Sequence, residues 1–595
     1  MTTMKSLKIS KYLILSVLVV GFTIACDLVE QPQDVASYGD VFNDEAGLRL
    51  YTNSLYNILP SANNITQGDA MSDYGARRDV PLFLREGAYG PGTTGGWSWG
   101  QLRNVNYFLD NNTNTDIPAS VRNHHNGIAR FFRAMFYFEK VQRYGDVPWI
   151  DTALDIDDPK LFEGRDSREM VMDNVLADLN FAIDNLNPGV NQSRTLITRD
   201  VALALKSRIA LFEGTFRKYH ADGLAQGLGN TANDWLNEAV SASQELIQSG
   251  RYSVYTGSGE NSYQQLFKTD SPNSAEDILV VEHDIDLDVL HSANWWYTSS
   301  TFGVRLSFIR PFINTYLNID GTPFTNRPGY ETMVFTEEVK DRDLRLQQTI
   351  RTPGYTRIDG GQIVQTPPAF SYVYTGYHPH KWTLDDVFFD GWTNNTNSVV
   401  IFRYAEILLN YAEAKAELGT LTNTDWQQTI GALRSRAGIT GGTDALPTTA
   451  DPYLQSTYFP DISDPVILEV RRERGIELAL EGHRFSDILR WKRGELMEMD
   501  WTGIHLPGIN QYYDLNEDET PDVYFYDVAP PSDQRTSGVI YIDVTGSDFR
   551  VTGGTSGELL WRQDIPKDWE EKKYLYPIPE SDIQTNPNLG QNPGW

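Results

Sequence analysis

The chain has 595 residues, a formal net charge of −30 and an aromatic content of 12%. A surface this acidic repels phosphate backbones, which argues against a function in nucleic-acid binding. The single cysteine rules out disulfide bonds within the chain, so the fold must be stabilised by packing.

The first 25 residues predict an export signal that ends at the single cysteine, Cys26. Lysines precede a short apolar run at residues 12–20, and the segment that follows the run ends in alanine, as in a signal peptide. The arrangement resembles a bacterial lipobox, with Thr23 in place of the usual leucine. We therefore expect Cys26 to carry a lipid anchor, followed by a polar tether over residues 26–40. The alternative is an ordinary secretory signal that contains a chance cysteine.

Helical periodicity dominates the next part of the chain, from about residue 41 to residue 250. Apolar residues three and four positions apart predict helices at 127–144, 167–186 and 198–218. Ser167 and Thr198 precede the second and third of these helices and are typical N-caps. Successive helices with short connections predict paired-helix packing of the tetratricopeptide kind.

The remainder of the chain alternates between irregular and helical patterns. Residues 251–397 are rich in Gly, Pro, Thr, Asn and Tyr, which predicts loops and short strands that could carry binding residues. Helical patterns return at 399–418, 424–437 and 465–494. Residues 500–565 are again irregular. The tail at 574–595 is rich in Pro, Asn and Gly, so we expect an extended strap without a helix.

Four segments together carry a family resemblance. They are RFFRAMFYFEKVQRYGDVPWI at 130–150, IFRYAEILLNYAEAKAELG at 401–419, RRERGIELALEGHRFSDILRW at 471–491 and YPIPESDIQTNPNLGQNPGW at the end of the chain. In this order and spacing they resemble the SusD/RagB family, the surface lipoproteins that Bacteroidota place over TonB-dependent transporters.

The resemblance implies a fold, a function and a location. The fold is mainly α: a tetratricopeptide-like frame of helix pairs, about 41–250 and 399–494, carries irregular ligand-binding insertions at about 251–397 and 500–565. Residues 41–595 would form a single domain. The protein would bind oligosaccharides, or peptides, as the lid of a SusC-like transporter, without catalysis and without a required cofactor. It would be lipid-anchored in the outer membrane and face the cell exterior.

Charged residues recur three or four positions apart within 471–491, a spacing that brings opposite charges together on a helix. They are Arg474, Glu477, Glu481, Arg484, Asp487 and Arg490. We interpret them as a structural ion-pair network, in preference to catalytic carboxylates. His483 and Asp487 have the spacing of two metal ligands, but no third ligand accompanies them, so we assign the histidine to capping or to the network.

Tryptophans on a glycine-rich loop are the first candidates for ligand binding. Trp97 and Trp99 precede a helical segment in which Arg103 and Asn104 could bond hydroxyl groups, and the family resemblance implies a glycan site in this region. We expect at least one of these indoles to pack in the core. The same residues, GWSWG, match the G-x-S-x-G motif of hydrolases at Ser98. The preceding segment is a flexible loop where that motif needs a strand, so we favour the binding interpretation.

A second aromatic cluster comprises Trp295, Trp296 and Tyr297. Three adjacent aromatic residues cannot all face one core from a helix or a strand, so we expect at least one to be exposed or to line a groove. Trp382 and Trp392 are weaker candidates. For each of them, the sequence favours a position in the core and a position in a binding site equally.

An acidic segment at 514–522 has the spacing of a calcium loop. Its candidate oxygen ligands are Asp514, Asn516, Asp518, the carbonyl of Thr520, and Asp522. Glu519 replaces the glycine that usually occupies the sixth position of such loops. We predict a structural Ca²⁺, with a solvated acidic turn as the alternative.

Two other functions remain open on the sequence alone. A helical glycoside hydrolase would need two correctly separated carboxylates, and a tetratricopeptide module would bind only protein. Neither the sugar nor its linkage can be inferred from these residues.

Overall fold

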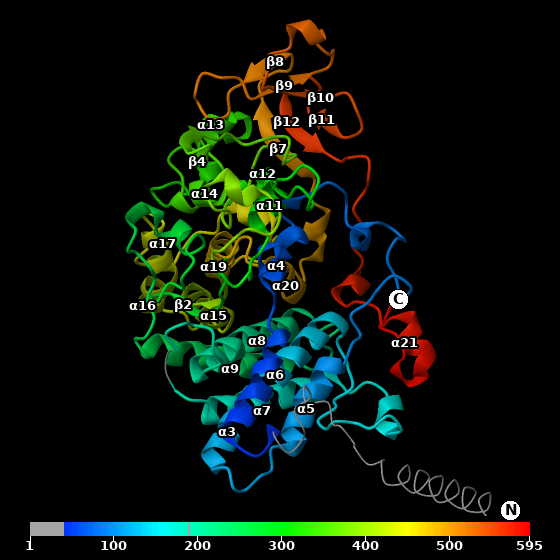
Figure 1. The fold of residues 1–595 in the computed structure, drawn as a ribbon. Helices are drawn as coiled ribbons and strands as arrows, with labels where there is room; N and C mark the ends of the chain where they lie inside the picture. The colour runs from blue at the N-terminus through cyan, green and yellow to red at the C-terminus, as the bar shows by residue number, and fades with distance from the viewer. Residues whose placement is uncertain (1–40, 189–190) are drawn as a thin grey trace, which may run out of the picture.

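The computed structural model describes residues 41–188 and 191–595. Figure 1 shows a lower layer of long helices, a middle region of shorter helices and irregular chain, and an upper end with short strands. One hydrophobic core extends through the long helices, the middle region and part of the upper strands.

The lower layer contains the long helices of the N-terminal half. They are α3 (Glu45–Ser54), α5 (Gly100–Asn111), α6 (Ala119–Tyr144), α7 (Arg168–Asn185), α8 (Arg199–Tyr219) and α9 (Ala232–Gln248). Consecutive helices pack as pairs, α6 with α7 and α8 with α9. The predicted N-caps are confirmed: Ser167 Oγ accepts the Met170 N–H at 3.3 Å, and Thr198 Oγ1 accepts the Val201 N–H at 3.4 Å.

The later long helices extend this frame. They are α15 (Tyr404–Glu417), α19 (Pro465–Glu477) and α20 (Arg484–Arg490). Helix α15 packs against α9 and α19, and α20 packs against α8. Residues 423–436 also form helical turns, α16 (Asn423–Trp426), a π-helical turn (Gln427–Gly431) and α17 (Ala432–Arg436).

Short helices and strands build the middle and upper regions. The short helices are α4 (Ala62–Thr66), α10 (Ser262–Gln265), α11 (Ala293–Thr298), α12 (Arg310–Ile313), α13 (Phe335–Glu338), α14 (Leu344–Thr349), α18 (Pro452–Thr457) and α21 (Glu580–Thr585). The two-stranded pairs are β1 (Gly75–Ala76) with β3 (Ser307–Phe308), β2 (Asp277–Val281) with β6 (Val399–Arg403), and β4 (Thr356–Asp359) with β5 (Gln362–Gln365). The two three-stranded sheets are β8 (Gln511–Tyr513), β9 (Val523–Tyr526) and β10 (Ile540–Asp543), and β7 (Trp501–Leu506), β12 (Gly557–Trp561) and β11 (Phe549–Val551).

The helix predicted at 399–418 begins instead with a strand. Residues 399–403 form β6, which pairs antiparallel with β2, and helix α15 starts only at Tyr404. The sequence VVIFR is rich in β-branched and aromatic residues, and all five positions of β6 are buried. The prediction was wrong here because the strand partner lies more than a hundred residues away in the chain.

The helix predicted at 465–494 is divided into α19 and α20. The chain turns between them with a positive φ at Leu480 (65°) and at Gly482 (80°). The buried carboxylate of Asp69 accepts the N–H groups of Gly482 (3.1 Å) and Arg484 (3.2 Å), and so satisfies donors at the start of α20. This remote capping contact ends the continuous helix that local periodicity predicts.

The C-terminal tail follows the lower helices as a strap, as Figure 1 shows on the right. The Tyr576 N–H donates to the Arg143 carbonyl at 2.6 Å, and Asn592 Nδ2 donates to the Tyr144 carbonyl at 2.9 Å. The expectation that the tail lacks a helix was wrong, because Glu580–Thr585 forms α21. This segment contains neither Pro nor Gly, and Pro579 precedes it at the helix N-terminus.

The charged residues of 471–491 form the predicted structural network, in which most partners come from other elements. Glu477 accepts hydrogen bonds from Arg345 (2.8 Å), from Arg403 (2.6 Å) and from Arg436. The other members pair as Arg474 with Asp487, Arg490 with Glu413, Glu481 with Lys381 and Arg403, and Arg484 with Asp73. All of these side chains are buried, and they connect α19 and α20 to α15, β6 and the N-terminal segment.

Candidate functional site

The loop that carries Trp97 and Trp99 is docked onto helix α6. Trp97 packs edge-on against Tyr144, with ring centroids 4.8 Å apart, and Trp99 lies 5.6 Å from Phe136. Lys140 Nζ donates to the Gly96 carbonyl at 2.5 Å. Both indoles are therefore half-buried, and each has only part of its surface available to a ligand. Ser98 is exposed between them, and the residues directly before it, 77–97, form no strand.

Arg103 and Asn104 lie on the exposed side of helix α5. The Asn104 backbone carbonyl accepts the Tyr51 hydroxyl at 3.0 Å, while its side chain points to solvent. Both side chains remain candidates for contacts with a ligand on this helix.

Trp295 belongs to a separate aromatic surface on the middle region, which we call the aromatic platform. Its members are Trp295, Phe302 and Trp392. The ring of Trp295 stacks on Phe302 with a centroid separation of 3.6 Å and an interplanar angle of 8°. Trp392 lies 5.2 Å from Trp295 and is 74% exposed. The platform is thus an aromatic surface with one indole almost wholly in solvent.

The two residues that follow Trp295 on α11 differ in exposure. Trp296 is half-buried and meets Phe302 edge-on at 6.0 Å. Tyr297 is 2% exposed, and its hydroxyl donates to the Thr66 carbonyl. Tyr297 therefore presents no ring face to a ligand, whereas Trp295 stacks within the platform and Trp296 touches its edge.

Hydrogen bonds hold the loop of Trp392 in place beneath the platform. Asn395 Nδ2 donates to Asn294 Oδ1 at 2.7 Å, and Asn294 Nδ2 donates to Asp390 Oδ1 at 3.2 Å. Arg357 also pairs with Asp390 at 2.5 Å. Because α11 and the loop are bonded to each other, the exposed indole is held before any ligand arrives.

The two tryptophans that the sequence left undecided have opposite environments. Trp382 is completely buried and donates its indole N–H to the Leu480 carbonyl at 2.7 Å, whereas Trp392 is exposed. The sequence did not indicate Phe302. Its position among Ser, Thr and Gly in SSTFG is the one local signal for an exposed aromatic residue.

The structure does not bring the two predicted groups of tryptophans together. Trp97 and Trp99 contact rings of α6, and Trp295 contacts Phe302 and Trp392. Within residues 41–188 and 191–595, no ring contact joins the groups. They are therefore two aromatic surfaces, of which the platform is the more exposed.

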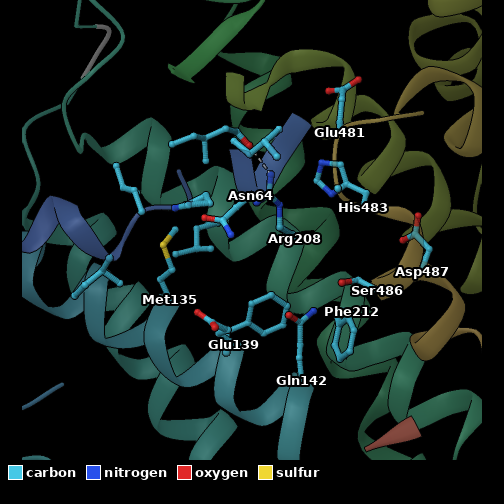
Figure 2. A pocket seen from close by; sticks show the side chains of 18 of the residues that line it. Asn64, Met135, Glu139, Gln142, Arg208, Phe212, Glu481, His483, Ser486 and Asp487 are labelled. Atoms are coloured by element: carbon cyan, nitrogen blue, oxygen red, sulfur yellow. Dashed lines mark hydrogen bonds between the residues drawn. The ribbon is translucent and has the colours of Figure 1, made fainter. Parts of the chain in front are cut away.

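A pocket of about 460 Å³ lies between the long helices and the region above them. We call it the central pocket. Figure 2 shows Met135, Glu139 and Gln142 of α6 along one side, with His483 and Ser486 on the other. Its remaining walls come from α8, β6, α5 and the segment 57–65. None of the predicted ligand-binding residues lines it, although Met135 and Phe138 belong to the apolar stripe of α6.

The charged side chains in the wall of the central pocket are mostly paired. Arg208 pairs with Glu406 at 2.7 Å, and Asp487 pairs with Arg474 at 2.8 Å. His483 occupies the N-cap position of α20 but makes no capping hydrogen bond. Burial, followed by the charges of Arg208 and Arg474, lowers the pKa of His483 well below its ordinary value, so the imidazole is neutral.

The acidic segment 514–522 curls into a tight loop between β8 and β9. Asp514 accepts the N–H groups of Asn516 (3.1 Å) and Glu519 (2.8 Å), and Glu519 adopts a φ of 67°. Asn516 is 2% exposed, and its Nδ2 donates to Asp518 at 2.9 Å. Its Oδ1 has no hydrogen-bond partner among residues 41–188 and 191–595. Burial, reinforced by Asp514 and Asp518, raises the pKa of Asp522 to about 6.

These observations leave the calcium site as a prediction. Among the described residues, no three Asp, Glu, His or Cys side chains form a group that could hold a metal ion. The predicted ligand set also includes the amide of Asn516 and the carbonyl of Thr520, which are oxygen ligands that Ca²⁺ accepts beside carboxylates. Thr520 is exposed, and its N–H donates to Asp518 Oδ1 at 2.8 Å.

The predicted lipid anchor at Cys26 lies outside the part of the chain that the structure describes, because Cys26 precedes residue 41. Among residues 41–188 and 191–595, no helix has both the length and the apolar character needed to cross a bilayer.

Comparison with known families identifies the group to which the chain belongs. The model of the SusD family matches residues 217–595, which is more than half of the chain. The chain belongs to the SusD family. The match includes the platform and the 514–522 loop, whereas the loop of Trp97 and Trp99 precedes it.

Relatives of this SusD-family chain include two proteins of Formosa agariphila. SusD-like protein P38 is 25% identical over 61% of this chain, and that alignment spans 65% of the relative's own length. SusD-like protein P2 is 24% identical over 82% of this chain and 92% of the relative.

Solved structures share the fold of this SusD-family chain. A SusD-like protein from Bacteroides fragilis superposes with a TM-score of 0.67 at 20% identity, over 96% of this chain and 100% of the other. A structure described as a SusD-like carbohydrate binding protein from the same species gives a TM-score of 0.65 at 20% identity, over 92% and 99% of the two chains. The predicted mainly α, SusD-like fold class is therefore confirmed.

Proposed function

We propose that this SusD-family protein binds oligosaccharides at the cell surface without altering them. The aromatic platform is the observation that carries the proposal. Pyranose rings present C–H faces that pack on flat indole and phenyl rings, and Trp392 offers such a face to solvent. The family membership and the carbohydrate-binding structure with the same fold support the same ligand class.

The test is affinity electrophoresis of the purified protein in gels that contain different polysaccharides. Covering one indole face with sugar is worth on the order of 1–3 kcal/mol. Trp392→Ala should therefore weaken binding about tenfold or more, at ~1.4 kcal/mol per decade. Phe162→Ala is the matched control, because Phe162 is an aromatic residue that is 52% exposed on a different surface.

Three results would contradict the proposal. Retention that is unchanged in Trp392→Ala and Trp295→Ala would show that the platform is not the binding site. Release of reducing ends from a retained polysaccharide would favour the alternative of a glycoside hydrolase. Binding to peptides alone would identify the ligand class as peptide.

We further propose that the protein is anchored in the outer membrane by a lipid on Cys26 and acts as the lid of a SusC-like TonB-dependent transporter. The lipobox resemblance and the family membership support this proposal. Isolation from outer membranes in mild detergent should recover a complex with a barrel protein. Cys26→Ala should release the protein from membranes or leave an uncleaved precursor. Recovery of a monomer alone, or membrane association of a processed Cys26→Ala protein, would contradict it.

A further inference from the structure

The central pocket contains polar side chains that have no partner in the part of the protein that the structure describes. Glu139 and Gln142 project from α6, and His483 and Ser486 face them from the start of α20 (Figure 2). Within the described residues, none of these four side chains makes a hydrogen bond or an ion pair. Glu139 is exposed and the other three are half-buried, so solvent and small molecules can reach them.

The charges that line the central pocket favour a neutral ligand. Arg208, Arg474 and Arg490 are each bonded to a carboxylate, and Glu481 is bonded to Lys381 and Arg403. Glu139 is therefore the unpaired charge among the residues described in this lining. An anionic ligand would be repelled by that carboxylate and would find no free cation.

The unpartnered groups match the hydrogen-bonding pattern of sugar hydroxyls. A carboxylate accepts, whereas an amide, a hydroxyl and a neutral imidazole each offer both a donor and an acceptor. Met135, Phe138 and Phe212 supply apolar surface beside them. A volume of about 460 Å³ is within the range of small-molecule sites. The polar side chains can therefore bond the hydroxyl groups of a sugar while the apolar side chains contact the C–H face of its ring.

We propose that the central pocket is a second saccharide site, which binds one neutral hexose unit between α6 and α20. It shares its ligand class with the proposed function but uses none of the platform residues. A sugar bound here would bridge the helical frame and the region above it. Because it binds only the folded protein, it would raise the melting temperature as its concentration increases.

The experiment uses saturation-transfer NMR and thermal melting of the full mature protein with millimolar glucose, galactose and mannose. Glucuronate and galacturonate serve as anionic counterparts of the first two sugars. We expect at least one neutral hexose to bind and to raise the melting temperature. If the hexose that binds is glucose or galactose, the corresponding uronate should bind at least tenfold more weakly. Glu139→Gln should reduce the difference in affinity between the hexose and its uronate. Replacing a residue with a merely structural role would not have this effect.

Variants separate the pocket from the platform. Ser486→Phe should fill the pocket and abolish hexose binding, and Gln142→Ala, a milder change near the rim, should weaken it severalfold. Gln244→Ala, at an exposed glutamine of α9, is the matched control. Trp392→Ala should leave hexose binding at the pocket intact while it weakens retention by polysaccharide.

The outcomes distinguish the two proposals. If no neutral hexose binds, or if Gln142→Ala and Ser486→Phe both bind hexose like the wild type, the pocket proposal is overturned whatever the platform does. If hexose binding is lost in Trp392→Ala and kept in the pocket variants, the platform is the sugar site and the pocket is not. If pocket binding holds while Trp392→Ala and Trp295→Ala leave polysaccharide retention unchanged, the platform proposal fails alone.

Discussion

Trp392 has a backbone conformation that bulky residues seldom adopt. Its φ of 59° lies in the left-handed region, which costs on the order of 1–3 kcal/mol for a residue other than glycine. The hydrogen bonds among Asn294, Asp390 and Asn395 fix the surrounding loop in the conformation that requires it. The fold thus accepts local strain, and the indole is held outside the core.

Two substitutions at Trp392 should separate this strain from ligand binding. Trp392→Gly removes the indole and relieves the backbone strain. Trp392→Ala also removes the indole, but the strain remains. We expect the glycine variant to be more stable than the alanine variant by roughly 1 kcal/mol, with glycan affinity equally reduced in both. Urea unfolding and affinity electrophoresis provide the two measurements. An alanine variant as stable as the glycine variant would show that the loop relaxes once the indole is gone.

Glu477 is the residue on which the buried ion pairs of α19 converge. Burial opposes its ionisation, but Arg436, Arg403 and Arg345 hold the pKa of its carboxyl well below the ordinary value. Removing one partner from a buried ion pair typically costs about 3–5 kcal/mol, because the remaining charges are left uncompensated. Glu477→Gln should reduce the free energy of unfolding by about that amount. Glu86→Gln, at an exposed loop position, is the matched control and should change it by less than ~0.5 kcal/mol.

The same carboxyl predicts how stability depends on pH. Because its pKa is lower in the folded state, its contribution is complete above the unfolded pKa of about 4.5 and is lost as the pH falls below that value. The acid side of the stability profile should therefore be shallower in Glu477→Gln than in the wild type. Parallel profiles below pH 4.5 would contradict this assignment.

At the scale of elements, local sequence predicted the helices whose ends are set locally. Ser167 and Thr198 cap α7 and α8 through their own neighbours in the chain, so their positions could be read from the sequence. The strand β6 and the break before α20 depend on β2 and on Asp69, which lie far away in the chain. Helix periodicity contains no information about such partners, and both were missed for that reason.

The candidate site was predictable to a similar extent. The run of three adjacent aromatic residues indicated the platform through Trp295, and Trp392 was left undecided because only tertiary packing distinguishes it from Trp382. The central pocket could not be predicted, because its lining comes from segments that are hundreds of residues apart in sequence. Its residues Met135 and Phe138 have the same periodicity as any buried stripe.

The predicted calcium site in the loop between β8 and β9 can be tested through the thermal stability of the protein. A bound Ca²⁺ would use Asp514, Asn516, Asp518, the Thr520 carbonyl and Asp522. It would also give a ligand role to the Oδ1 of buried Asn516, which has no hydrogen-bond partner among the described residues. Calcium should then raise the melting temperature and a chelator should lower it. Combined Asp514→Ala and Asp518→Ala should abolish that response, while Asp527→Ala, outside the loop, should retain it. A melting curve indifferent to calcium and chelator would identify the loop as a solvated acidic turn.

On the scale of the whole molecule, the C-terminal strap joins the end of the chain to helix α6 and to the segment before α7. Asn592 donates to the carbonyls of Tyr144 (2.9 Å) and Tyr576 (2.7 Å), and accepts from Arg165 at 2.6 Å. One buried side chain therefore connects α6, the segment before α7 and the strap itself.

Replacing this side chain should loosen the strap. Asn592→Ala removes the donor to two carbonyls and one of the acceptors of Arg165. Each group that stays buried and unsatisfied costs about 1–3 kcal/mol. The melting temperature should fall, and limited proteolysis should cleave first within 574–595. Gln584→Ala, at an exposed position of α21, is the matched control. Cleavage that begins elsewhere at an unchanged rate would contradict the assignment.

The position of Asn592 also determines the order in which the protein can be completed during synthesis. Its hydrogen bond to Tyr144 spans 448 positions of the sequence. A ribosome makes α6 long before it reaches the strap. The Tyr144 carbonyl at the end of that helix therefore has no Asn592 donor until the last residues of the chain are made. A premature stop codon near the 3′ end of the message would therefore damage a helix that had been translated hundreds of codons earlier.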